Sequence, residues 1–174
     1  DGLEKVFAVN GQHPLAWAYK AALAHLDNDP QAEEAARNEA PSTWKQNPEV
    51  DHLIGKKLSQ KYRFREGAGY QRLALKFDPT YLPAKMQLSQ DLLRLGQEPE
   101  GWKLAEEVFE QDGYNVVAHN LATLRDRLTK FTLLERDGFI VRMENHEAKI
   151  YGPMVLDLLS RAKSQLAAKY EVTL

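Results

Sequence analysis

A repeat of 34 residues constrains the fold of this chain more than any other feature of its sequence. Four windows keep this spacing and start at Pro14, Pro48, Leu82 and Val116. The eighth position is small in every window and reads Ala21, Gly55, Ser89 and Thr123. The twentieth position is glycine in the second and third windows, at Gly67 and Gly101. A period of this length is typical of solenoids, in which stacked units bury a continuous core.

Small residues at fixed positions indicate two helices that cross closely within each window, because a bulky side chain there would push the helices apart. Asp78-Pro79 and Asp112-Gly113 close the second and third windows with residues that favour turns. The first window departs from the pattern, with Lys20 at the seventh position and Glu33 at the twentieth, and we expect it to break at Pro41. The fourth window supplies only a first helix.

The pattern predicts a series of helices joined by short links, which makes sequential neighbours antiparallel. We expect them at 14–27, 30–40, 48–61, 64–77, 81–95, 98–111 and 115–128. The pattern then changes, because Asp137-Gly138 lies between β-prone runs at 131–135 and 139–143. That arrangement predicts a tight β-hairpin.

A long helix is expected from about 146 to 169. Its apolar residues recur at helical spacing, at Val155, Leu158, Leu159, Ala162 and Leu166. Gly152-Pro153 is expected to kink its first turns or to restart it, and residues 170–174 predict the start of another strand. A two-stranded ribbon with one helix is marginally stable, so we interpret this region as the opening of a truncated α/β domain.

The repeated columns resemble the tetratricopeptide repeat (TPR), a helix–turn–helix unit that stacks into a superhelix. The second and third windows carry the resemblance, with Ile54, Gly55, Leu58, Gly67, Ala74, Pro79 and Leu88, Ser89, Leu92, Gly101, Val108, Gly113. The resemblance implies a mainly α fold, a TPR-like right-handed α–α superhelix followed by a short β-hairpin and a long C-terminal helix. The implied domains are 1–130, with repeats at about 14–47, 48–81 and 82–115 and an extra helix at 116–129, and 131–174.

A narrower resemblance concerns bacterial TPR proteins joined to a gluzincin-like peptidase of the MA clan. It is carried by the segments 47–55, 57–62, 81–85, 91–96, 137–143 and 147–152. It implies a bacterial protein in which a zinc-dependent catalytic domain lies beyond residue 174. No zinc ligand carries over, because His146-Glu147-Ala148-Lys149-Ile150 has isoleucine where HExxH needs its second histidine.

Composition excludes several kinds of chemistry. The chain has no cysteine, so disulfides, thiol catalysis and cysteine-ligated zinc are excluded. Its net charge of -2 argues against general nucleic-acid binding, and no apolar run is long enough for a membrane span. No serine lies in a GxSxG elbow, and Gly67-Ala68-Gly69 lies inside a predicted helix rather than after a strand. We therefore expect no catalytic residue, no metal and no cofactor in this chain.

Charge is distributed unevenly along the repeats. Residues 55–77 carry a net charge of +6, from seven cations and Glu66, whereas residues 27–39 and 98–112 carry -4 and -5. One interpretation, the favoured one, is that neighbouring repeats attract each other and so fix the order of stacking. The alternative is a basic surface that receives an acidic peptide or the carboxylates of a partner, with an effect on specificity and encounter rate.

In TPR proteins the first helices line a concave groove. Carried onto this chain, that resemblance implies partner-binding residues at Glu49, His52, Lys56, Ser59, Met86, Gln90, Leu93, Asn120, Leu124 and Arg127. A carboxylate clamp is not supported, because the fifth position reads Ala18, His52, Met86 and Asn120. Met86, Leu93 and Leu124 would form an apolar patch that either binds an extended peptide or, as we favour, is covered by the C-terminal helix.

The leading functional hypothesis is a protein–protein interaction scaffold without catalysis. The alternative is the N-terminal regulatory or substrate-presenting region of a zinc-dependent peptidase, and a third hypothesis is an oligomerisation module. We expect a protein or peptide partner, and we expect a soluble protein without a targeting segment in this chain. Its compartment and oligomeric state are left open, and Asp1 in place of methionine suggests a piece of a longer protein.

Overall fold

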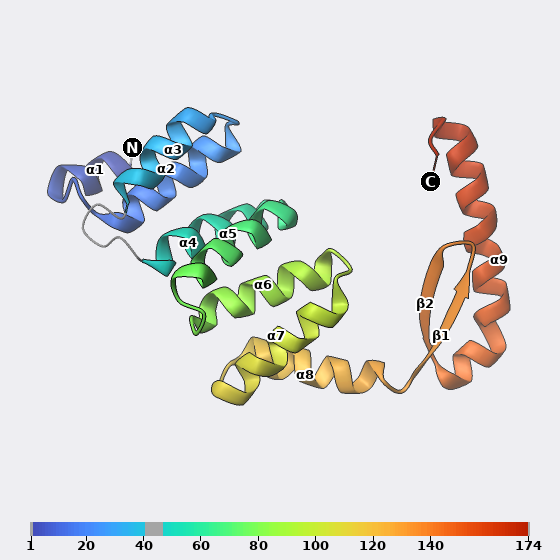
Figure 1. Cartoon of the computed structure of the whole chain (residues 1–174). Helices are drawn as coiled ribbons and strands as arrows, with labels where there is room; N and C mark the ends of the chain where they lie inside the picture. The colour runs from blue at the N-terminus through green and yellow to red at the C-terminus, as the bar shows by residue number, and fades with distance from the viewer. Residues whose placement is uncertain (1, 41–46, 174) are drawn as a thin grey trace. The chain divides into compact units, whose positions relative to one another are not determined.

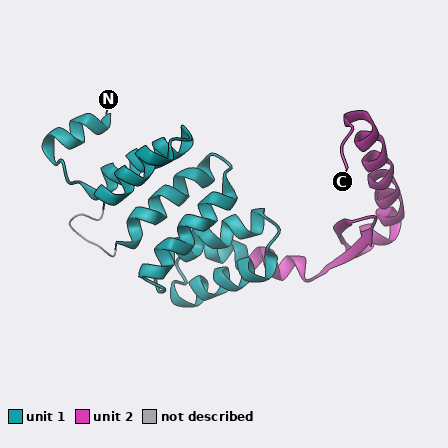
Figure 2. Cartoon of the chain, turned by 45° about the horizontal axis from the view of Figure 1, so that its top comes forward, with its two compact units in different colours: residues 1–122 teal, residues 123–174 magenta. Residues whose placement is uncertain are grey.

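The structure is a computed structural model that describes residues 2–40 and 47–173. The predicted break at Pro41 lies outside these residues. The chain divides into two compact units, Asp1–Ala122 and Thr123–Leu174 (Figure 2). The division falls within a helix, whereas the sequence analysis places the domain boundary at residue 130.

The first unit is a stack of antiparallel helices (Figure 1). Its helices are α1 (Gly2–Val9), α2 (Pro14–Leu26), α3 (Pro30–Glu39), α4 (Pro48–Gln60), α5 (Phe64–Phe77), α6 (Leu82–Arg94) and α7 (Glu98–Gln111), and α8 (Val116–Leu128) runs across the division. The bounds of α2 to α8 agree with the prediction to within one residue at each end. Helices α2, α4 and α6 pair with α3, α5 and α7, which confirms the predicted hairpins. The sequence analysis missed α1.

The predicted helix crossings lie where the small residues are. A Cβ atom added to Gly55 would lie 2.8 Å from the Gly67 carbonyl oxygen and 2.5 Å from Gln71 Nε2. In the next repeat the fully buried Ser89 donates its hydroxyl to the Gly101 carbonyl oxygen at 2.7 Å. The helix backbones therefore touch in both repeats, and larger side chains have no room.

Buried polar groups connect successive repeats. Arg37 on α3 donates two hydrogen bonds to the carboxylate of Asp51 on α4, at 2.8 and 3.1 Å. Asp91 on α6 is fully buried, and its oxygens accept from Ser59 Oγ on α4 at 2.8 Å and from Gln87 Nε2 at 3.0 Å. Among the described residues every buried side-chain nitrogen or oxygen has a hydrogen-bond partner. The polar contacts thus satisfy one another and fix which helix faces which.

Charge attraction between neighbouring repeats is present but limited. Arg72 on the basic helix α5 pairs with Glu100 on the acidic helix α7 at 3.2 Å, as the favoured interpretation requires. Glu33 on the acidic helix α3 pairs with His25 of its own repeat at 2.8 Å, and the same imidazole contacts Glu66 on α5 of the next repeat. The exposed Arg72–Glu100 pair contributes about 0–1 kcal/mol, so the buried contacts carry more of the stacking specificity.

The second unit contains the predicted hairpin. Strands β1 (Phe131–Arg136) and β2 (Phe139–Glu144) pair antiparallel, with Arg136 opposite Phe139. Asp137 and Gly138 form the two-residue turn with positive φ angles of 53° and 85°, the backbone that this turn class needs. One face of the hairpin packs on α9, and the other face leaves Leu133 and Ile140 exposed.

Helix α9 (Asn145–Tyr170) is continuous through Pro153, so it does not restart there. It meets the hairpin along a face that includes the buried Ala148 and Gly152, and a Cβ atom on Gly152 would lie 2.6 Å from Leu134 Cδ1. The predicted apolar face is wrong at Leu158, which is 58% exposed, because the contact with the hairpin follows the face through Gly152.

The predicted strand at 170–174 is also wrong for the described residues. Tyr170 ends α9, and Glu171 adopts a left-handed conformation that closes the helix, with Val172 N donating to Ala167 O at 3.1 Å. This is the usual backbone geometry of a helix C-terminus. Residue 174 lies outside the described residues.

We predict opposite effects for the same substitution at two glycines of the first unit. Gly55→Ala lowers the free energy of unfolding by roughly 1–3 kcal/mol, because the new methyl group meets backbone atoms of α5. Gly69→Ala raises it by about 0.5–1 kcal/mol, since no atom lies within 4 Å of its added Cβ. Urea unfolding followed by circular dichroism measures both. Equal effects at the two sites would contradict the crossing.

We predict that Asp91→Asn stabilises the protein near neutral pH. Burial raises the pKa of the Asp91 carboxyl, so the folded state holds its proton more tightly than the unfolded state. The free energy of unfolding therefore falls as pH rises from the ordinary aspartate pKa through the raised one. Asparagine removes this loss, and its amide can donate to Ser59 Oγ, which then donates to Gly55 O. The advantage of the variant should shrink towards pH 4 in urea titrations; a pH-independent difference would contradict the assignment.

Candidate functional site

Two of the ten predicted groove residues lie in the core of the first unit rather than on its surface. Ser59 and Met86 are buried, Ser59 against Asp91 and Met86 in the core with Val108. Glu49, Lys56, Asn120, Leu124 and Arg127 are exposed, whereas His52, Gln90 and Leu93 are half-buried. Leu124 and Arg127 belong to the second unit. The C-terminal helix, which we expected to cover the apolar patch, packs on the hairpin of its own unit.

His52 and Leu93 hold helices together rather than face outward. His52 Nδ1 lies 2.8 Å from Gln71 Oε1, and its imidazole ring meets the Tyr81 ring edge-on at 5.6 Å between centroids. Burial and, less strongly, the charge of Lys56 lower the pKa of His52, while the hydrogen bond to Gln71 opposes them. The folded repeat therefore favours the neutral imidazole. Leu93 packs where a Cβ atom on Gly101 would come within 2.8 Å of its Cγ.

The turn between α4 and α5 concentrates positive charge. Residues 56–65 contain five cations and no acid. Arg63 is used internally, because its Nε donates to Glu66 Oε1 at 2.9 Å and its Nη1 donates to His25 O. The hydrogen bond from Arg63, most strongly, and that with the His25 imidazole lower the pKa of Glu66. Lys61 and Arg65 are exposed and form no ion pair with any residue that the structure describes.

Tyr62 occupies a backbone conformation that tyrosine rarely adopts. Three helix C-termini of the first unit end on a left-handed residue at the same position of the repeat: Asn28, Tyr62 and Gly96, with φ of 57°, 63° and 76°. Asparagine and glycine are the residues that favour this conformation. A bulky residue there costs roughly 1–2 kcal/mol. The turn after α4 therefore carries backbone strain that its two counterparts avoid.

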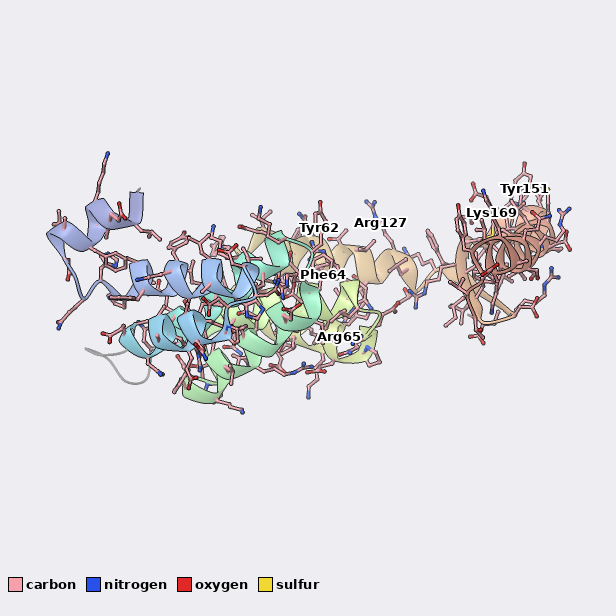
Figure 3. All side chains as sticks on the ribbon, turned by 90° about the horizontal axis from the view of Figure 1, so that it is seen from above. Tyr62, Phe64, Arg65, Arg127, Tyr151 and Lys169 are labelled. Atoms are coloured by element: carbon pink, nitrogen blue, oxygen red, sulfur yellow. The ribbon has the colours of Figure 1, made fainter. Side chains whose placement is uncertain are left out.

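The Tyr62 side chain does not offset this strain by burial. It is 83% exposed, and its ring meets the Phe64 ring edge-on at 5.9 Å between centroids. The Arg94 guanidinium lies over the Phe64 ring, 5.1 Å from its centroid. Figure 3 labels Tyr62, Phe64 and Arg65 around the turn. We name Lys61, Tyr62, Phe64 and Arg65 the basic turn.

The basic turn is the candidate functional site of the first unit. It presents an aromatic ring with a polar tip beside two exposed cations, a combination that suits a protein or peptide ligand with carboxylates. The sequence analysis identified the positive charge but missed Tyr62. The signal was present in the repeat, where tyrosine replaces asparagine and glycine at the position of the left-handed turn.

The described residues hold no group of three or more His, Cys, Asp or Glu side chains that could bind a metal ion. His146 and Glu147 begin α9, where their backbone N–H groups donate to the Glu144 carboxylate at 2.7 and 3.1 Å. These bonds lower the pKa of Glu144. None of the described helices is both long enough and apolar enough to cross a membrane.

Comparisons with known proteins identify the fold. The chain resembles the first TPR of Spaghetti (RPAP3) bound to the HSP90 peptide SRMEEVD, with a TM-score of 0.52 at 18% identity over 68% of this chain and 94% of that one. The TPR domain of Arabidopsis OM64 gives 0.51 at 13% identity over 66% and 95%. MamA gives 0.52 at 10% identity over 72% and 73%.

This chain has a TPR-like fold. The predicted fold class is therefore confirmed, including the two-stranded hairpin and the C-terminal helix. No protein-family model and no curated protein sequence matches the chain. At these low identities the likeness establishes the architecture alone.

We predict that Tyr62→Gly raises the free energy of unfolding by about 1 kcal/mol, because glycine adopts the left-handed conformation without strain. Tyr62→Ala is the matched control: it removes the same exposed ring but keeps a Cβ atom at the strained position, and it should change stability little. Urea unfolding at neutral pH compares the three proteins. Equal stability of the glycine and alanine variants would contradict the strain.

Proposed function

We propose that this chain is a protein–protein interaction scaffold that binds an acidic peptide segment of its partner at the basic turn. The observation that carries the proposal is Tyr62, an exposed ring in a strained turn beside the exposed cations Lys61 and Arg65. Local strain that packing does not explain is frequently retained at functional sites. We expect the partner interaction to be the reason that tyrosine stands here.

The chemistry of the turn defines the ligand class. Tyrosine supplies a large contact area at low cost in conformational entropy and is enriched at binding hot spots. Exposed cations attract the carboxylates of a ligand and raise the rate of association. Salt weakens this attraction. The TPR domain of Spaghetti (RPAP3) that shares this architecture is bound to a peptide with two glutamates and an aspartate. That precedent supports an acidic peptide as the ligand of this chain.

Exposed residues of the predicted groove extend the proposed surface. Lys56 lies near the basic turn in sequence and adds a further positive charge, and Glu49 lies at the opposite end of α4. We propose Lys56 as a secondary contact. Ser59 and Met86 are buried and have no part in the proposal. The zinc-peptidase alternative, and with it a bacterial origin and the second domain from residue 131, stays a prediction from sequence.

The test uses two labelled peptides in fluorescence anisotropy: SRMEEVD, and SRMQQVN, in which amides replace the three acidic side chains. We expect the acidic peptide to bind more tightly, and we expect Lys61→Glu with Arg65→Glu to weaken it at least about tenfold, a loss of about 1.4 kcal/mol. Tyr62→Ala should weaken it similarly. Arg63 is left unchanged because it holds repeats together.

Lys76→Glu provides the control, because Lys76 is an exposed cation near the other end of α5. It should leave binding of the acidic peptide within about twofold. Equal affinity for SRMEEVD and SRMQQVN, or an equal loss in the Lys76 variant, would overturn the proposal, since binding would then depend on net charge or on no charge at all.

A further inference from the structure

Helix α1 has the position in the repeat of a second helix. The 34-residue period places Asn10 in the same register as Asp78 and Asp112, each of which follows a second helix. All three side chains accept a hydrogen bond from the backbone N–H two residues later, at 3.0, 2.8 and 3.2 Å. The backbone bond that closes the turn also recurs, from His13 N to Asn10 O at 3.2 Å and from Tyr81 N to Asp78 O at 3.1 Å.

Side-chain contacts repeat the same equivalence. Phe7 on α1 packs on Trp17 of α2, with ring centroids 4.6 Å apart. Phe109 on α7 packs on His119 of α8 at 5.8 Å, and both residues stand three whole periods after the first pair. Helix α1 therefore meets α2 as α7 meets α8, which makes α1 the second helix of a repeat that precedes α2.

The first helix of that preceding repeat would cover residues that are exposed in this structure. Val6 on α1 corresponds to Ala74 and Val108, which are 0% exposed in complete repeats, yet Val6 is 37% exposed. Leu23 on α2 corresponds to Asp91 on α6, which is buried against the preceding first helix α4, yet Leu23 is 51% exposed.

A groove of about 530 Å³ lies along α1 and α2 at these exposed residues. It is lined by Leu3 and Val6 from α1 and by Leu15, Tyr19 and Leu23 from α2. In the next repeat, the residue equivalent to Leu23 is Lys57, and its Nζ lies over the Tyr19 ring of the preceding first helix at 5.1 Å. By this equivalence, the helix that neighbours Leu23 would be a first helix, and it would pack on both α1 and α2.

We propose that this groove is the seat of an amphipathic helix that the natural polypeptide supplies ahead of residue 1. The helix would begin 34 residues before Pro14, in register with α2, α4 and α6. It would place apolar side chains against Leu3, Val6 and Leu23 and a small residue at its eighth position. The solenoid would then continue through α1 to at least one further repeat.

The test compares the natural polypeptide, including its residues before Asp1, with the chain of 174 residues. This chain has no cysteine, so Leu23→Cys introduces a single reporter into it. We expect a maleimide, followed site by site by mass spectrometry, to modify Cys at this position at least about tenfold more slowly in the natural polypeptide. The substitution Val9→Cys is the control, because Val9 is 89% exposed and its counterparts Phe77 and Gln111 stay exposed in complete repeats.

A stability measurement supplies a second readout. Leu23→Asp should lower Tm by more than about 5 °C in the natural polypeptide and by less than about 1 °C in the 174-residue chain, because only the former buries the carboxylate. Equal labelling rates and equal Tm changes in the two proteins would overturn the proposal. A natural reading frame without a helix at this place, or protection of Leu23 that appears only on dimerisation, would overturn it as well.

Discussion

The stack depends on backbone touching backbone at one point in each repeat. Gly55 against Gly67, and Ser89 against Gly101, allow the paired helices to approach until carbonyl oxygens lie at the contact. Nothing larger fits, so the spacing of these residues fixes the spacing of the helices. The partly buried pair Arg37–Asp51 and the buried pair Ser59–Asp91 then select which helix faces which in the next repeat. Burial of apolar residues supplies the driving force, while these contacts supply the geometry.

The helices were predictable because period and turn chemistry agree along residues 14–128. Helix α1 was missed because the windows were counted from Pro14, although Asn10-Gly11 has the register of Asp112-Gly113. The strand expected after Tyr170 was wrong because β-prone residues do not determine structure alone, and Glu171 closes α9 instead. The groove residues were assigned from their position in the repeat, by resemblance to the TPR family. That position does not show how a side chain packs, and Ser59 faces Asp91 on a neighbouring helix rather than a ligand.

Packing also decides which charged side chains hold helices together and which stay exposed to a ligand. Arg63 and Arg65 stand two residues apart, yet the first is engaged by Glu66 and the second forms no ion pair with the described residues. Tyr62, directly before Arg63, keeps a conformation that its counterparts Asn28 and Gly96 adopt without strain. In a repeat protein such exceptions can be recognised, because each residue can be compared with the residues at the same position of the other repeats. The proposed peptide site and the proposed helix seat on α1 both come from residues that differ from their equivalents in burial, backbone or pairing.

The central claim is the backbone contact between paired helices, and nuclear Overhauser effects between α-protons test it most directly. The account predicts cross-peaks between Gly55 and Gly67, and between Ser89 and Gly101, because a Cβ atom built on Gly67 would lie only 3.0 Å from Gly55 O. Absence of both cross-peaks, in a spectrum that contains the sequential contacts of α4 and α5, would contradict it.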